Sequence, residues 1–494
     1  MGGADRQMDI LGGRNLREIN RHGSAVCPVS LMIQWVCQLN INCRGPIEHA
    51  SHIIITDVGL LCNGGACGQT LFPYMALNIH INRGIIYNKY IMGIFVRVEV
   101  RSMRDEMRAY LDLPVDRHGT NCEKWDGLEK HFGRGDLLAM WVADMDFRTV
   151  PQVREALVRR AEHAIYGYTD TAEEDRQAEA GWLLRRHGLK VETDWILYSP
   201  GVVDSLFYCV GALTDPGDAI LVQPPVYGPF YEAVRLFGRR LVTNPLARDG
   251  QGWQMDFDDL EAKFAAGVKM MILCSPHNPV GRVWTRQELQ RLVDLANRYG
   301  VLLVSDEIHA DFDLDGRGQT RILSLEGAEK CVMLTSATKS FNLAGLRQSS
   351  AIVPDEKLRT ALKEAIHRAH ADMPNLFGAI AQTAAYTHGD EWMDAVVEYV
   401  RENRDYAVSA MARQLPEIGC APQQGTYLMW LDFTGLDLPH EAVKDLLVNR
   451  AHVALNDGLF FGPEGEGWFR MNLATQRRNV EKTLENIHQA IRSR

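Results

Sequence analysis

Lys339 is the residue whose type and surroundings most directly suggest chemistry. It stands in the segment S-A-T-K-S-F-N-L-A-G (336–345), just beyond a short apolar run and among small hydroxyl residues. A primary amine held in such a place can attack a carbonyl carbon and form an imine. An isolated lysine is more often an ordinary surface residue, so this interpretation depends on the residues that accompany it.

Three residues upstream offer the other groups that an imine-forming site for pyridoxal 5′-phosphate (PLP) requires. Asp306 directly follows an apolar run, and a carboxylate there can keep the pyridine nitrogen of the cofactor protonated. Asn278 in S-P-H-N-P-V-G can donate to the phenolic oxygen, and Tyr227 in Q-P-P-V-Y can stack on the ring. Taken singly, they are also compatible with a solvated loop aspartate, a plain turn and a core tyrosine.

A phosphate site is predicted where Gly201, Val202 and Val203 open a probable helix over 204–212. The free backbone N–H groups at a helix start bind phosphate well, although a glycine there is weak support by itself. Ser336 and Arg347, on either side of Lys339, can add a hydroxyl and a guanidinium contact.

The elements that must position these residues follow an alternating pattern. Short β-rich runs, each followed by polar or turn residues, lie at 219–222, 270–274, 301–304 and 332–334. Helical stretches are expected at 153–163, 176–187, 287–299 and 392–415, the second ending at Gly188. This pattern predicts an α/β fold with a mostly parallel central sheet covered on both faces. Ligands of such sheets gather beyond the carboxyl ends of the strands, which is where the polar residues fall.

Composition narrows the functional classes. The 494-residue chain is 46% hydrophobic and 23% charged, with a net charge of -10, which argues against a broad nucleic-acid surface. Its ten cysteines include no CxxC pair and no metal-ligand spacing, so free thiols in a reducing compartment are expected. No apolar run reaches the roughly 20 residues that span a bilayer, and no secretory signal is evident. The expectation is a cytoplasmic protein without a membrane or metal partner.

As a set, G-V-V at 201, N-P-V-G at 278, D-E-I-H at 306 and S-A-T-K-S-F-N at 336 resemble the class I/II PLP-dependent aminotransferase superfamily. Within it, the bacterial cystathionine β-lyase-like C–S lyases are the most similar branch. G-T-N-C-E-K-W-D at 119, W-V-A-D-M-D-F at 141 and Y-G-Y-T at 166 resemble features of that branch. The resemblance runs from about Leu111 to the C-terminus and leaves out the first fifth of the chain.

The resemblance implies further roles for individual residues. Arg470 in W-F-R-M-N-L-A matches the arginine that grips the substrate α-carboxylate, and Ala143 falls in a matching substrate-binding segment. His309 stands among the cofactor-binding residues, where many transaminases have tyrosine. Tyr168, or less well Tyr166, matches the tyrosine that reaches into the neighbouring subunit's site, which implies a homodimer with shared active sites. Arg347 is a departure, because related lyases often lack arginine there while aspartate-type transaminases have it.

The resemblance also implies the PLP-dependent transferase (aspartate aminotransferase-like) fold and its division into domains. Residues 154–391 are expected to form a large PLP-binding domain and residues 392–494 a smaller C-terminal α+β domain. The N-terminal segment 108–153 is expected to join the small domain. Residues 1–107 have no recognisable motif and remain an extension of unknown role. Either they form a genuine accessory segment or, as the favoured interpretation, the start was assigned too early and Met103 or Met107 begins the protein.

Three functions remain open. The favoured one is a carbon–sulfur β-lyase that cleaves cystathionine or a related amino-acid thioether to a thiol, pyruvate and ammonia. The second is an aminotransferase of broad amino-acid range, which would use the same residues. The third is a non-catalytic regulatory protein on a PLP fold, which has no need of an imine-forming lysine and is therefore disfavoured by Lys339, Asp306 and Arg470.

Overall fold

The computed structural model describes residues 103–249 and 252–493, together with four strands of an N-terminal unit. The chain divides into two units, Met1–Arg101 and Ser102–Arg494. In the first, strands pair in the order β1-β2-β4-β3, with the bounds β1 (Ile54–Leu61), β2 (Tyr74–His80), β4 (Ile94–Arg97) and β3 (Lys89–Ile91). The rest of that unit, and with it most of the expected extension 1–107, lies outside the described residues.

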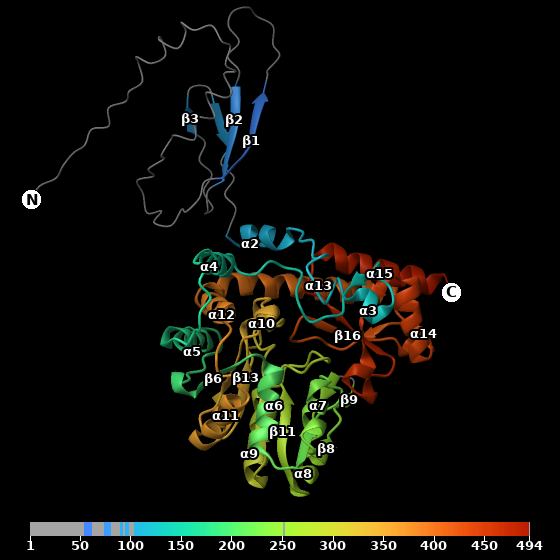
Figure 1. The fold of residues 1–494 in the computed structure, drawn as a ribbon. Helices are drawn as coiled ribbons and strands as arrows, with labels where there is room; N and C mark the ends of the chain where they lie inside the picture. Colours follow the sequence, from blue (N-terminus) through green and yellow to red (C-terminus); the bar gives the residue numbers. More distant parts are fainter. Residues whose placement is uncertain are drawn as a thin grey trace, which may run out of the picture. The chain divides into compact units, whose positions relative to one another are not determined.

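The second unit is built on a seven-stranded sheet (Figure 1). Strand β14 runs antiparallel to both of its neighbours, and the other neighbouring pairs are parallel. The predicted fold class, an α/β unit on a mostly parallel sheet, is therefore confirmed. The strands are, in spatial order, β6 (Ile196–Ser199), β14 (Ser349–Ile352), β13 (Val332–Thr335), β12 (Leu302–Asp306), β11 (Val268–Cys274), β7 (Ala219–Val222) and β8 (Arg240–Thr243).

Strand alternation explains how this sheet buries both of its faces. Met270 and Ile272 of β11 belong to one apolar core, which includes helix α6 (Val202–Leu213). Met271 and Leu273, which point to the other face, belong to a second core with helix α9 (Arg286–Tyr299). Continuous apolar strands of this kind are typical of parallel sheets with helices on both sides. The ends of α9 also follow from sequence, because Thr285 and Glu288 form a capping box and Gly300 ends it in the left-handed conformation.

The C-terminal part adds a four-stranded sheet in the order β15-β16-β19-β18, with β15 (Gly419–Cys420), β16 (Leu428–Asp432), β19 (Trp468–Asn472) and β18 (Asn456–Asp457). The long helix α13 (Asp390–Gln414) and helix α15 (Arg477–Arg492) lie at the opposite end of this unit from helices α8 (Phe257–Ala265) and α9 (Figure 1). The N-terminal segment joins this part, because β5 (Leu138–Ala139) pairs with β17 (Val453–Ala454). Helix α2 (Met103–Asp112) packs against α13, so this unit starts a few residues before the expected boundary at 107.

Candidate active site

Polar residues collect where three neighbouring parallel strands end. Asp306 is the last residue of β12, Asn278 follows β11, and Lys339 follows β13 on the short helix α10 (Ala337–Ser340). Since β11, β12 and β13 are adjacent in the sheet, their carboxyl ends bring these loops to one edge. This is the edge at which the sequence predicted a ligand site.

Lys339 is half-buried, and its amine is held by the N-terminal segment of the second unit. Its Nζ donates to the carbonyl oxygen of Ala143 at 2.6 Å, and the hydroxyl of Tyr427 donates to the same oxygen at 2.9 Å. Burial lowers the pKa of Lys339 to about 8, against the opposing influence of the Asp144 and Asp306 carboxylates. A lysine in this state is partly unprotonated near neutral pH and therefore able to act as a nucleophile or a base.

Asp306 lies near this amine and has an unusual charge state. Burial raises the pKa of its carboxyl to about 7, while the hydrogen bond from the Ile308 N–H and the charge of Lys339 oppose the rise. Within the described residues, the only hydrogen bond to this carboxyl is that N–H, at 3.1 Å. A buried carboxylate with so few donors is stabilised when a positively charged group binds beside it.

Arg470, on strand β19, reaches the same region from the C-terminal sheet. Its two terminal nitrogens donate to Asn278 Oδ1 at 3.1 Å, Asn456 Oδ1 at 2.8 Å and the Trp141 carbonyl oxygen at 3.2 Å. Burial lowers the pKa of Arg470 to about 10. Its Nε has no hydrogen-bond partner among the described residues. The guanidinium carries a full charge with no carboxylate bonded to it in this part of the chain, which suits it to an anionic ligand.

Two aromatic residues named by the sequence border the same space. Tyr227 is half-buried, and its ring centroid lies 5.7 Å from that of Phe460. The charges of Arg470 and Asp306 both act on its hydroxyl, which indicates that all three lie close together. His309 packs edge-on against Tyr427 at 5.5 Å, and its Nδ1 has no partner among the described residues. Burial holds the pKa of His309 well below its usual value, and the charges of Lys339 and Arg470 act in the same direction.

The predicted phosphate end contains the expected residues in a different arrangement. Gly201 precedes helix α6, and an added Cβ would lie 2.6 Å from Asp204 Oδ2, so only glycine fits without a shift. Arg347 donates to both carboxylate oxygens of Asp204, at 3.2 and 3.0 Å. Ser336 donates to the Gln348 carbonyl oxygen and caps α10 by accepting from the Thr338 N–H. The side chains of Ser336 and Arg347 therefore both form hydrogen bonds within the protein, which their positions in the sequence did not indicate.

Tyr168 is the predicted residue that the structure does not bring to this site. Its side chain is 96% exposed, and the neighbouring Ile165 and Tyr166 are 66% and 59% exposed. Tyr166 donates its hydroxyl to the Ala161 carbonyl oxygen and its ring contacts Phe377. The Tyr168 side chain therefore contributes nothing to the site of its own chain.

Several residues that sequence reasoning missed hold the segment 141–147 beside Lys339. Asn472 donates to the carbonyl oxygens of Val142 and Asp144, at 2.7 and 2.6 Å. Asn342 binds the backbone of Met145 through both its amide oxygen and its nitrogen. The position of Asn472 was accessible in principle, because it lies two residues after Arg470 on a strand and so shares its face. No local signal marks Tyr427 as a partner of Ala143.

Comparison with known proteins identifies the family. Residues 136–487 match the family model described as aminotransferase class I and II. The chain belongs to this family. It is 39% identical to cystathionine beta-lyase PatB of Bacillus subtilis over 383 residues, which cover 77% of this chain and 99% of that protein. It is 34% identical to protein MalY of Escherichia coli, over 77% of this chain and 98% of that one.

A solved family structure supports the fold independently. Cystalysin of Treponema denticola, whose structure contains a pyridoxal 5′-phosphate cofactor, superposes with a TM-score of 0.75 at 30% identity. The match covers 78% of this chain and 98% of cystalysin. The predicted class I/II membership, C–S lyase branch and fold are therefore confirmed. Among the described residues, no cluster of side chains is suited to a metal ion, and no helix is both long and apolar enough to cross a membrane.

Proposed function

We propose that this chain is a PLP-dependent carbon–sulfur β-lyase that cleaves cystathionine or a related cysteine S-conjugate with water to a thiol, pyruvate and ammonia. The relatives named cystathionine beta-lyase support the reaction class. The observation that carries the proposal is the meeting of a half-buried amine, a buried carboxylate and a buried guanidinium at one end of the sheet. These are Lys339, Asp306 and Arg470.

The donor set fits PLP. Lys339 offers a partly unprotonated amine to the aldehyde, and Asp306 offers a carboxylate without a cationic hydrogen-bond partner to the ring nitrogen. The unpartnered Nδ1 of His309 and Nε of Arg470 are buried polar atoms of the kind that a bound group satisfies. The start of helix α6, with Val202 and Val203, offers backbone N–H groups to the phosphate.

When bound, PLP supplies an electron-accepting ring that stabilises negative charge on the α-carbon of an amino acid. Arg470 binds the α-carboxylate of the substrate, and Asn278 and Asn456 fix its guanidinium. The amine of Lys339 takes the α-proton, and its lowered pKa of about 8 makes it an effective base near neutral pH. Asp306 would keep the ring nitrogen of the bound cofactor protonated, and Tyr227 would help to hold the ring.

We further propose that the enzyme is a homodimer in which Tyr168 completes the partner's site. The support is the exposed apolar stretch formed by Ile165, Tyr166 and Tyr168, because such a contiguous patch is normally covered by another surface. Sedimentation analysis of the protein before and after Tyr168→Asp and Ile165→Asp substitution tests this. A wild-type species of monomer mass would contradict it.

The function is tested by incubating the purified protein with cystathionine and following pyruvate without any added keto acid. Steady pyruvate release in parallel with homocysteine is expected. Strict dependence on a keto acid would contradict the lyase assignment and indicate transamination. Absence of both activities, with cofactor bound, would contradict the enzyme assignment altogether.

A further inference from the structure

Another largely buried carboxylate, Asp311, lies five residues beyond Asp306, on the loop that follows strand β12. Asp311 accepts hydrogen bonds from three side chains that come from two other elements. Trp182 and His187 of helix α5 (Glu173–His187) bond its Oδ1, at 3.1 and 2.8 Å, and Ser340 of helix α10 donates to its Oδ2. Ser340 directly follows Lys339 in the chain.

Several neighbours of this carboxylate favour its ionised form. Burial would raise the pKa of the Asp311 carboxyl, but the hydrogen bond and charge of His187, the charge of Arg321 and the Ser340 hydroxyl together lower it to about 2. Since Asp311 is ionised, His187 Nε2 must carry the proton and donate it. Hydrogen bonds to a buried charge are worth more than those between neutral groups, so this link resists displacement.

The packing around Asp311 fixes the two residues that follow Lys339. Ser340 donates a hydrogen bond to Asp311. Trp182 packs edge-on against Phe341 with ring centroids 5.2 Å apart, so helix α5 contacts Ser340 through Asp311 and Phe341 directly. Asp311 in turn is joined to Asp306 by only four intervening residues. The network is therefore connected through short stretches of chain to both Lys339 and Asp306, the two residues that would hold the cofactor.

We propose that Asp311 is a positioning residue that sets the placement of Lys339 relative to Asp306, with His187 and Trp182 orienting its carboxylate. This inference rests on the proposed attachment of the cofactor to Lys339. Among the described residues, Asp311 makes no hydrogen bond to the carboxyl of Asp306 or the amine of Lys339, and it acts through Ser340 and the backbone between residues 306 and 311.

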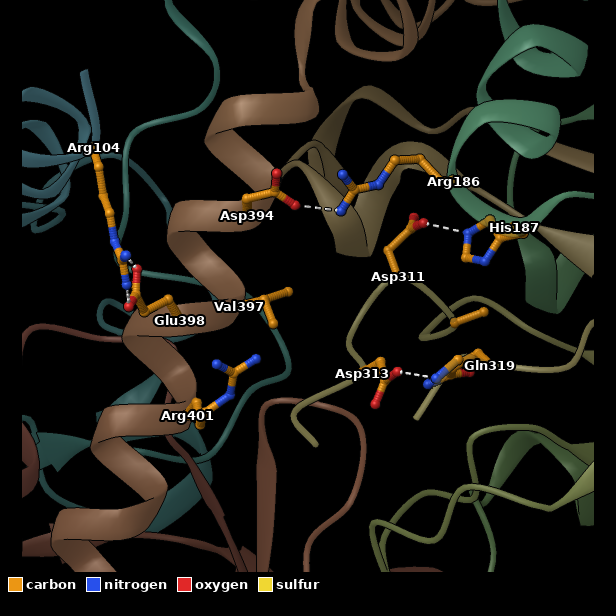
Figure 2. Close-up of a pocket in the computed structure, with 12 residues that line it drawn as sticks. Arg104, Arg186, His187, Asp311, Asp313, Gln319, Asp394, Val397, Glu398 and Arg401 are labelled. Atoms are coloured by element: carbon orange, nitrogen blue, oxygen red, sulfur yellow. Dashed lines mark hydrogen bonds and ion pairs between the residues drawn. The ribbon is translucent and has the colours of Figure 1, made fainter. Parts of the chain in front are cut away.

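A surface pocket gives experimental access to this network. It has a volume of about 400 Å³, and His187 and Asp311 form part of its wall, facing Asp394, Glu398 and Arg401 of helix α13 (Figure 2). Truncating His187 would enlarge this pocket by the volume of an imidazole ring next to Asp311. A small molecule with an N–H group can then enter and restore the lost hydrogen bond.

The test compares Asp311→Asn, Ser340→Ala and His187→Ala with Glu179→Gln. Glu179 is a matched control, because it is also a fully buried carboxylate on helix α5 and accepts from Ser350 and Gln382, which lie outside the lysine helix. We expect the first three variants to lose about 10- to 100-fold in kcat with little change in KM, as for other supporting residues. They should also release the cofactor faster on dialysis, whereas Glu179→Gln should match the wild type in both measurements.

Rescue separates positioning from a general packing role. Imidazole should restore kcat and cofactor retention in His187→Ala, while neutral 1-methylimidazole, which has no N–H, should not. The double variant Ser340→Ala/Asp311→Asn should be no worse than the poorer single variant, because both substitutions break the same link. Equal behaviour of all variants and the control, or rescue by both imidazoles, would overturn the proposal. Cofactor release is measured without substrate, so it tests the positioning role of Asp311 even if the protein has no lyase activity. If the Asp311→Asn variant does not fold, Ser340→Ala tests the same hydrogen bond.

Discussion

Asp306 ends strand β12 and Asp311 lies five residues later, and the pKa values of these two carboxyls are shifted in opposite directions. Burial raises the pKa of Asp306 to about 7, because a single backbone N–H bonds it within the described residues. The pKa of Asp311 falls to about 2, because the hydrogen bonds from His187 and Ser340 and the nearby charge of Arg321 outweigh the effect of burial. The protein itself supplies several hydrogen-bond donors to the Asp311 carboxyl but only one to the Asp306 carboxyl among the described residues.

This difference separates structural from ligand-binding chemistry at the site. A carboxylate that already accepts several hydrogen bonds is stabilised little by a further partner. A buried carboxylate with few donors is stabilised more when a cation binds beside it. Arg470 and His309 belong with Asp306 in this respect, since each keeps an unpartnered buried nitrogen among the described residues. Around Lys339, we therefore expect Asp306, Arg470 and His309 to meet the ligand, and Asp311 to support the residues that do.

We expect the largest loss of activity when the amine of Lys339 is removed. Lys339→Ala should lower kcat by at least about 10²–10⁴-fold, because it removes both the attachment point and the base. The visible absorbance of the bound cofactor should also change, and both are measured on the purified variant. Lys330→Ala, at an exposed lysine, is the control and should behave like the wild type. Lyase activity near the wild-type rate in Lys339→Ala would contradict the proposed role.

Substitution of Asp306, which has one hydrogen-bond donor among the described residues, should lower kcat more than substitution of Asp311, which has three. Asp306→Asn should lower kcat by about 10²–10³-fold, as expected when a fixed charge at the reacting system is lost. Asp311→Asn should lose less, within the range given above. Steady-state kinetics of both variants at saturating cofactor, with Asp258→Asn at a fully exposed aspartate as control, measures the order. A reversed order would show that the comparison assigns the two carboxylates wrongly.

Substitution of Arg470 tests how the substrate carboxylate is bound. Arg470→Lys keeps the charge but removes the paired geometry, and should raise KM for cystathionine on the order of tenfold to a hundredfold. The measurement is a full KM and kcat determination, with Arg291→Lys at a half-exposed arginine as control. An unchanged KM would mean that another cation binds the substrate carboxylate.

The smallest effect concerns a third buried carboxylate, Glu179. Burial raises the pKa of its carboxyl to about 7. A group whose pKa is raised by folding stabilises the protein below its unfolded pKa, and this stability is lost as the pH rises through the folded value. Glu179→Gln should therefore raise Tm relative to the wild type at pH 8 by roughly 2–4 °C, and less at pH 5. Parallel Tm curves for the two proteins across this range would contradict the shift.

Local sequence patterns predicted the elements and the residues at strand ends. The strand at 219–222 and the helix ending at Gly188 lie as expected, because alternation and a left-handed glycine act over a few residues. Lys339, Asp306 and Asn278 were found because each follows a strand of one parallel sheet. The sequence could place them together because the topology of such sheets leaves few alternatives.

The supporting contacts could not be predicted in this way. His187 and Asp311 are separated by 124 residues, and Tyr427 and Ala143 by 284. Their meeting depends on how whole elements pack, and an aspartate or tyrosine at such a position has no local signature. For the same reason, the pairing of Arg347 with Asp204 and the capping role of Ser336 became evident only in the structure.

The most direct test of the central claim is to reduce the purified holoenzyme with sodium borohydride and map the fixed cofactor by peptide mass spectrometry. The account predicts one modified peptide, with the pyridoxyl group on the side chain at position 339. A pyridoxyl group on any other lysine, or none on a protein that retains its cofactor, would contradict it.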